Sequence, residues 1–203
     1  MTEPDEYHEY QLELIGLELN ERTSLFMIEV NGDRPIIHQG RPLLFWNETN
    51  LDEKVDQMLT LADGDQETSD QDLELTPEYC AFPLGFVLEE LKTGSSVSSS
   101  DTLTCLNCLI DILLTIPEVD RESCMMRTLQ HCAIYFTYNS EYDALFDTPM
   151  VNREPQVPDP LEYREYMVPI NFFPEGTVLT RDDLISAIYQ ALGMITLYGE
   201  FVE

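Results

Sequence analysis

The sequence predicts a single α+β domain over residues 1–203, in which an N-terminal antiparallel β-meander packs against a central helix pair and a C-terminal amphipathic helix. Three observations predict this class. The first 46 residues alternate apolar and polar side chains between turn residues, residues 101–138 hold the densest apolar content, and residues 184–195 repeat apolar side chains at helical spacing. A chain of 203 residues is long enough to form one substantial core.

The first strand is expected at residues 10–19, where apolar and polar residues alternate. Ile15 and Gly16 interrupt the alternation, which fits a β-bulge. We expect Glu13 and Glu18 to lie on a solvent-exposed face. Further strands follow after turn residues, the clearest of which are Asn31, Gly32 and Asp33, and these strands span residues 24–30, 35–39 and 42–46.

Two helical regions are expected after the meander. The first covers residues 51–62, with Asn50 as its cap and acidic residues in its first turn, where the helix dipole favours anions. The second covers residues 77–92 and is interrupted or begins late at Pro83, with Phe86, Val87 and Leu91 buried. Residues 94–100 are rich in Gly and Ser, which predicts a flexible loop or an internal boundary.

The central pair begins with a helix at residues 103–116, for which Ser100 or Asp101 can serve as the N-cap. Its polar residues are three or four apart, so a narrow polar stripe runs along an otherwise buried helix. Pro117 ends this helix and suits the first turn of the next. Apolar residues then recur at helical spacing from 125 to 136, although residues 133–138 fit a strand equally well.

Four of the five cysteines lie in the central pair beside His131, which raises the question of a zinc site: Cys105, Cys108, Cys124 and Cys132. The Cys-x-x-Cys of a structural zinc site normally lies on a tight turn, whereas this one lies in an apolar helix. We therefore expect these cysteines to pack as small hydrophobic residues, and we expect no metal or other cofactor. An odd number of cysteines without a secretion signal argues against disulfides.

The C-terminal part begins with a proline-rich segment up to residue 163, which is expected to run extended over the surface. Residues 164–173 alternate like a strand. Thr180 and Asp183 resemble a capping box. They precede the most regular amphipathic helix of the chain, which we expect to pack on the central pair or on the sheet and whose apolar positions are Leu184, Ile185, Ile188, Leu192 and Ile195.

The formal net charge of −29 comes from 39 acidic and 10 basic residues, and Lys54 and Lys92 are the only lysines. Few cations are available to replace the counterions of phosphates, so we expect no direct nucleic-acid binding and no adhesion to anionic membranes. The chain has neither a signal-peptide pattern nor an apolar run of about 18 residues, so we expect a cytoplasmic protein. The sequence leaves the oligomeric state open.

The acidic loop at residues 63–74 resembles the calcium-binding loop of the EF-hand, and a predicted helix precedes it. Oxygen-bearing side chains occupy loop positions 1, 3, 5, 9 and 12, with Asp63 first and Glu74 last. Thr68 stands where the EF-hand has an invariant glycine, and Asp70 stands where it has an aliphatic residue. Weak calcium binding is therefore one alternative to a solvated acidic loop.

Catalytic motifs are missing from the sequence. It contains no G-x-S-x-G, no phosphate-binding loop, no glycine-rich dinucleotide turn and no H-E-x-x-H. His8, His38 and His131 lie at positions typical of structural or exposed histidines. We therefore expect a protein that is not an enzyme.

The charge is the remaining functional signal, because an acidic surface attracts basic partners at long range. We expect a non-enzymatic acidic binding protein that occludes a basic surface of a protein partner, as an inhibitor or an immunity protein does. The second interpretation is a DNA-mimic protein that competes for a nucleic-acid-binding protein. We rank it second because a mimic would place its carboxylates in rows along rigid elements, whereas the acids here are spread through loops and strands. A highly charged housekeeping or salt-adapted protein is the third.

The expected contact residues form the acidic loop and a second patch, in which Tyr142 and Phe146 supply apolar anchors. The full set is Asp63, Asp65, Glu67, Asp70, Asp72, Glu74, Glu141, Tyr142, Asp143, Phe146 and Asp147.

Overall fold

The computed structural model describes residues 11–30, 34–47, 50–63, 74–94, 99–138, 145–146 and 177–202. Within these residues the chain forms five helices and a mixed sheet, which confirms the α+β class. The elements in chain order are β1 (Gln11–Asn20), β2 (Thr23–Val30), β3 (Arg34–Pro35), β4 (Ile37–His38), β5 (Arg41–Trp46), α1 (Leu51–Asp63), β6 (Glu74–Phe82), α2 (Leu84–Thr93), α3 (Ser99–Thr115), α4 (Cys124–Tyr138), α5 (Arg181–Tyr198) and β7 (Glu200–Phe201).

The sheet has the strand order β4-β5-β2-β1-β6. The predicted N-terminal meander is confirmed, because β1 pairs antiparallel with β2, and β2 pairs antiparallel with β5. The short strand β3 pairs with β2, and β4 pairs with β5. Two strands that the sequence did not predict add parallel pairs, since β6 lies beside β1 and β7 beside β5.

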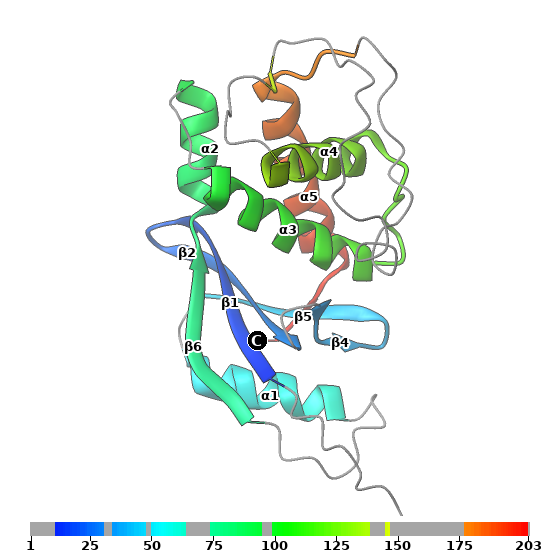
Figure 1. The fold of residues 1–203 in the computed structure, drawn as a ribbon. Coiled ribbons are helices and arrows are strands. Elements are labelled where there is room, and N and C mark those ends of the chain that lie inside the picture. Colours follow the sequence, from blue (N-terminus) through cyan, green and yellow to red (C-terminus); the bar gives the residue numbers. More distant parts are fainter. Residues whose placement is uncertain are drawn as a thin grey trace, which may run out of the picture.

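Helices cover both faces of this sheet (Figure 1). Successive side chains of a strand point to opposite faces. Leu25 and Met27 of β2 therefore belong to the core shared with α2–α5, whereas Phe26 and Ile28 belong to the core shared with α1. On the α1 side, the rings of Phe26 and Phe45 stack with their centroids 5.0 Å apart.

The expectation that Glu13 and Glu18 lie on a solvent-exposed face is wrong, because both are partly buried. The β-bulge expected at Ile15 and Gly16 is absent, because β1 pairs with β2 in continuous register through both residues. Glu13 and Glu18 therefore point to opposite faces of the sheet, and helices from distant parts of the chain cover both faces. Glu29, which lies opposite Glu13 in the register, is itself buried.

The central helix pair is confirmed as α3 and α4, which pack against each other. Residues 133–138 belong to α4, which resolves the strand alternative in favour of a helix. Pro117 ends α3 as predicted but does not begin the next helix. Turns intervene, and α4 begins at Cys124 after Ser123, whose Oγ accepts a hydrogen bond from the amide of Met126 at 3.3 Å.

The C-terminal helix α5 begins with the predicted capping box. The Thr180 hydroxyl accepts from the Asp183 amide at 3.2 Å, and the Asp183 carboxylate accepts from the Thr180 amide at 2.8 Å. The buried face of α5 contacts α2, α3 and α4, so this helix packs on the central pair as expected.

Residues 77–82 were expected to be helical, and the structure corrects this. They form the end of β6, in which Tyr79 and Phe82 lie opposite Leu14 and Leu17 of β1. A parallel strand pairs with a strand far away in sequence, so the local pattern of residues does not indicate the pairing. Helix α2 therefore begins only at Leu84, directly after Pro83.

Several predictions fall outside the described residues. These are the turn at 31–33, the extended segment after residue 138 apart from 145–146, and the strand at 164–173. Gly94 ends α2 in a left-handed conformation with φ of 72°, and α3 begins at Ser99. Residues 95–98 are not described, so the boundary expected at 94–100 stays a prediction.

Candidate binding cleft

Most of the predicted contact residues lie outside the described part of the chain. This holds for Asp65, Glu67, Asp70, Asp72, Glu141, Tyr142, Asp143 and Asp147. Asp63 is described as the last residue of α1 and Glu74 as the first of β6, by backbone only. The acidic loop therefore connects α1 to β6, and its binding role stays a prediction.

Phe146 is the exception, and its burial corrects the expectation that it is an exposed anchor. Its side chain is 4% exposed and belongs to the core between the sheet and α2–α5. The guanidinium carbon of Arg181 lies 5.9 Å from the ring centroid. Phe146 thus packs beside Arg181 in the first turn of α5 and offers no surface to a partner.

The structure contains a cleft that runs along α2 from Pro83 to Lys92. We call it the α2–α5 cleft. Its lining comes from the β1–β2 turn (within residues 18–24), from Asn47, from one side of α2 (within residues 83–92) and from Tyr189 of α5. Its volume is about 870 Å³, within the usual range for ligand pockets. The lining carries three acidic residues, Glu18, Glu21 and Glu89, and two basic ones, Arg22 and Lys92. Figure 1 shows the β1–β2 turn beside the start of α2.

Close contact between two backbones forms the floor of the α2–α5 cleft. A Cβ placed on Gly85 would lie 2.1 Å from the carbonyl oxygen of Leu19, so only glycine allows α2 to approach the end of β1 this closely. The amide of Val87 donates to the carbonyl of Pro83 at 3.0 Å, which closes the first turn of α2 at the same place. The cleft is therefore part of the packed fold.

Two aromatic side chains on the lining of the cleft are exposed. Phe86 is 57% exposed and Tyr189 is 50% exposed. The expectation that Phe86 is buried is therefore wrong. The buried stripe of α2 consists of Leu84, Val87, Leu88 and Leu91, and Phe86 lies off that stripe.

Lys92 supplies a cation inside the α2–α5 cleft. Its Nζ donates to Glu89 Oε1 at 2.8 Å and lies 5.9 Å from the centroid of the Tyr189 ring. Hydrogen bonding to Glu89 first, and then to Tyr189, raises the pKa of Lys92. The cleft thus already holds one ammonium group between a carboxylate and an aromatic ring.

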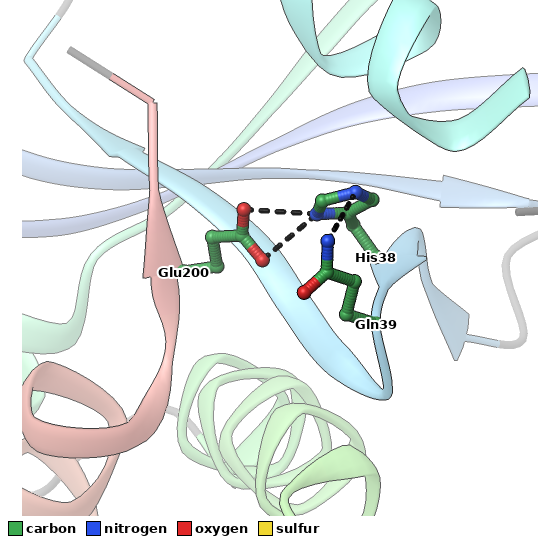
Figure 2. Close-up of polar contacts among 3 residues, drawn as sticks. All are labelled: His38, Gln39 and Glu200. Carbon is green, nitrogen blue, oxygen red and sulfur yellow. Dashed lines mark hydrogen bonds and ion pairs between the residues drawn. The ribbon is translucent and has the colours of Figure 1, made fainter. Parts of the chain in front are cut away.

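A second polar cluster joins the C-terminal strand to the sheet (Figure 2). His38 Nδ1 lies 2.9 and 3.0 Å from the two carboxylate oxygens of Glu200, and the Gln39 amide nitrogen lies 3.3 Å from His38 Nε2. These contacts fit the tautomer in which Nδ1–H donates to Glu200 and Nε2 accepts from Gln39. The pair connects β4 to β7.

Arg41 strengthens the same junction. It donates to the carbonyl of Tyr198 at 2.6 Å, in the last turn of α5, and it pairs with Glu118. A cation at this end also complements the helix dipole. The Val202 amide donates to the Leu44 carbonyl at 2.8 Å, and the Phe201 ring stacks on that of Trp46. We assign this cluster a structural role, that of holding β7 in the sheet.

The cysteines of the central pair mostly pack as expected. Cys105, Cys108 and Cys132 are buried, and burial raises the pKa of each thiol, that of Cys105 to about 12. Cys124 departs from the expectation, because it is exposed at the first residue of α4. Burial also lowers the pKa of His131. No group of three or more metal-binding side chains occurs among the residues that the structure describes.

The residues of the α2–α5 cleft were missed by the sequence analysis, although part of the signal was present. Phe86 and Tyr189 are large aromatic residues that fall off the apolar stripes of their own helices, and such positions predict exposed aromatic rings. Nothing local indicates that they meet residues 18–24, because the three segments come together only through the tertiary fold.

In the described part of the chain, none of the helices combines the length and the apolar character needed to cross a membrane. Comparisons with protein-family models, with curated proteins and with solved structures found no match to this chain.

Proposed function

We propose that the protein is a non-enzymatic acidic binding protein that occludes a basic surface of a protein partner. The observation that carries this proposal is the excess of 39 acidic over 10 basic residues. Even if every lysine and arginine paired with one carboxylate, 29 carboxylates would remain without such a partner. So much like charge opposes compaction, and binding of a cationic surface offsets that repulsion.

Three of the ten cations of the chain support the proposal by what they contact. Arg41 and Lys54 each donate to a backbone carbonyl of the chain itself, Tyr198 and Trp46 respectively. Lys92 pairs with Glu89. These three cations are thus engaged within the fold, which favours a surface that attracts positive charge.

The contact surface that we propose includes the acidic loop at 63–74 and the acidic residues Glu141, Asp143 and Asp147 with Tyr142. Phe146 is left out because it is buried. The carboxylates of the α2–α5 cleft, Glu18, Glu21 and Glu89, join the set because they combine with two exposed aromatic rings. Aromatic residues next to charged ones are typical of the residues that dominate interface energetics.

The experiment that tests this function is affinity capture from the native lysate on the immobilised protein, followed by washes of rising salt. An unrelated folded protein of similar negative charge is immobilised as the control. We expect one basic protein to bind to this chain in a near-equimolar amount and to elute with salt. The same basic protein should not bind to the control column. The same diffuse set of basic proteins on both columns would contradict the proposal. A nucleic-acid-binding protein displaced by DNA would instead favour the DNA-mimic interpretation.

A further inference from the structure

We propose that the α2–α5 cleft binds an arginine side chain of a basic protein segment, with the guanidinium against the exposed rings of Phe86 and Tyr189 and paired with the carboxylates of the lining. This inference rests on the proposed function, since it names the site and the side chain by which the basic partner is held. The acidic loop and the 141–147 patch are not needed for it.

The arrangement around Lys92 supports a cation site in the cleft. Its ammonium occupies a position that any cation in the cleft would favour, 2.8 Å from Glu89 Oε1 and 5.9 Å from the centre of the Tyr189 ring. Lys92 thus marks a cation position on a lining that carries two basic residues, Arg22 and Lys92. Glu18 and Glu21 lie on the same lining and form no ion pair with Lys92.

The chemistry of the lining suits arginine better than lysine. A guanidinium is planar, so it can stack on an aromatic ring while its N–H groups pair with a carboxylate in bidentate geometry. Phe86 and Tyr189 expose half or more of their surface beside three carboxylates. A compact, strongly hydrated ammonium makes less use of the two rings.

The backbone of the cleft is preorganised. The floor of the cleft is fixed by the contact of Gly85 with Leu19, and its walls belong to a strand turn and two helices that pack in one core. A site whose shape exists before binding loses less conformational entropy when its ligand arrives. The volume of about 870 Å³ accommodates an arginine side chain together with the backbone that carries it.

The test uses two triple variants of equal charge. The cleft variant carries Glu18→Gln, Glu21→Gln and Glu89→Gln. The control variant carries Asp52→Asn, Glu53→Gln and Asp56→Asn, three exposed acids of α1, which covers the opposite face of the sheet. The probe is a fluorescein-labelled peptide, Gly-Arg-Gly-Arg-Gly, whose dissociation constant is measured by fluorescence anisotropy at low salt. Circular dichroism and thermal melting establish that both variants are folded.

We expect the cleft variant to weaken binding of the peptide about tenfold, which corresponds to three exposed ion pairs, and the control variant to weaken it less than twofold. The double variant Phe86→Ala and Tyr189→Ala should weaken binding of the arginine peptide more than that of Gly-Lys-Gly-Lys-Gly, because stacking favours the guanidinium.

Substitution of a lysine should change binding of the arginine peptide in the opposite direction. Lys92→Met removes one of the two cations on the lining, the one that pairs with Glu89, and should tighten binding of the arginine peptide. Lys54→Met removes the only other lysine, which contacts Trp46 and Phe45 away from the cleft, and changes the net charge equally. Lys92→Met should therefore tighten binding of the arginine peptide more than Lys54→Met does.

Equal weakening by the two triple variants would overturn the cleft as the site and leave the proposed function standing, because attraction would then follow total charge. A wild-type protein that captures a basic partner but does not bind the arginine peptide would also overturn the inference alone. If the protein captures no basic partner and binds neither peptide, the proposed function and the inference fail together.

Discussion

Gly85 of α2 and Leu19 of β1 are in backbone contact so close that an ideal Cβ on Gly85 would lie 2.1 Å from the Leu19 carbonyl oxygen. This contact joins the larger helix layer to the end of the sheet and shapes the floor of the α2–α5 cleft. It therefore links the stability of the fold to the geometry of the candidate site.

Gly85→Ala should lower the free energy of unfolding by about 3 kcal/mol, because the added methyl group forces α2 away from β1. Denaturant unfolding measures this change. Gly193→Ala is the matched control in α5, where an added Cβ meets nothing within 4 Å. It should raise stability by about 0.5–1 kcal/mol, since alanine favours the helix. Equal effects of the two substitutions would show that the close contact is not formed.

Arg41→Ala should destabilise the protein by about 2 kcal/mol, because it removes hydrogen bonds from a charged donor to the Tyr198 carbonyl and to Glu118. Thermal and denaturant unfolding measure the loss. Arg41→Lys keeps the charge but cannot reach both acceptors with one planar group, so it should fall between wild type and Arg41→Ala. Wild-type stability of Arg41→Ala would contradict the structural role of this junction.

The cysteines should differ sharply in reactivity. In native protein at pH 8, iodoacetamide should modify the exposed Cys124 and leave Cys105, Cys108 and Cys132 unmodified until the chain unfolds. At that pH a thiol with a pKa of about 12 is a thiolate in about one molecule in ten thousand. Peptide mapping by mass spectrometry identifies the modified sites. Rapid native labelling of Cys105 would contradict its burial in α3.

His131 should make the protein sensitive to acid. Burial lowers its pKa below the ordinary 6.5, so the unfolded chain takes up a proton at higher pH than the folded chain does. Its contribution to stability is present above pH 6.5 and is lost as the pH falls from there towards the folded pKa, at no more than about 1.4 kcal/mol per pH unit.

His131→Gln provides the comparison, because glutamine does not titrate. Unfolding measured between pH 7.5 and 5 should show that wild type loses stability relative to the variant as the pH falls. A constant difference between the two proteins over this range would mean that His131 takes up its proton equally in both states.

The parts of the fold that the sequence predicted correctly depend on neighbouring residues. The capping box of Thr180 and Asp183 is a local interaction, and the stripe of α5 follows from its own periodicity. The strand at 77–82 was missed because its parallel partner, β1, lies some sixty residues earlier. The local alternation also predicted a solvent-exposed face for Glu13 and Glu18. That prediction failed because helices cover both faces of the sheet, and the local pattern does not contain this tertiary packing.

The candidate site likewise combines features that composition predicts with features that depend on the tertiary fold. The kind of partner that we propose follows from net charge, which is a property of composition. The α2–α5 cleft depends on the meeting of the β1–β2 turn, α2 and Tyr189, which sequence periodicity does not contain. Phe146 was expected at the surface because it lies among acids, but Arg181 and the core of the helix layer hold it inside.

The most direct test of the account repeats the affinity capture with three immobilised proteins: wild type, the cleft variant and the α1 control variant of equal charge. The retained basic partner is quantified by mass spectrometry at one moderate salt concentration. The account predicts that the control variant retains the partner as wild type does and that the cleft variant loses most of it. Equal retention by all three proteins would contradict the claim that the α2–α5 cleft holds the partner.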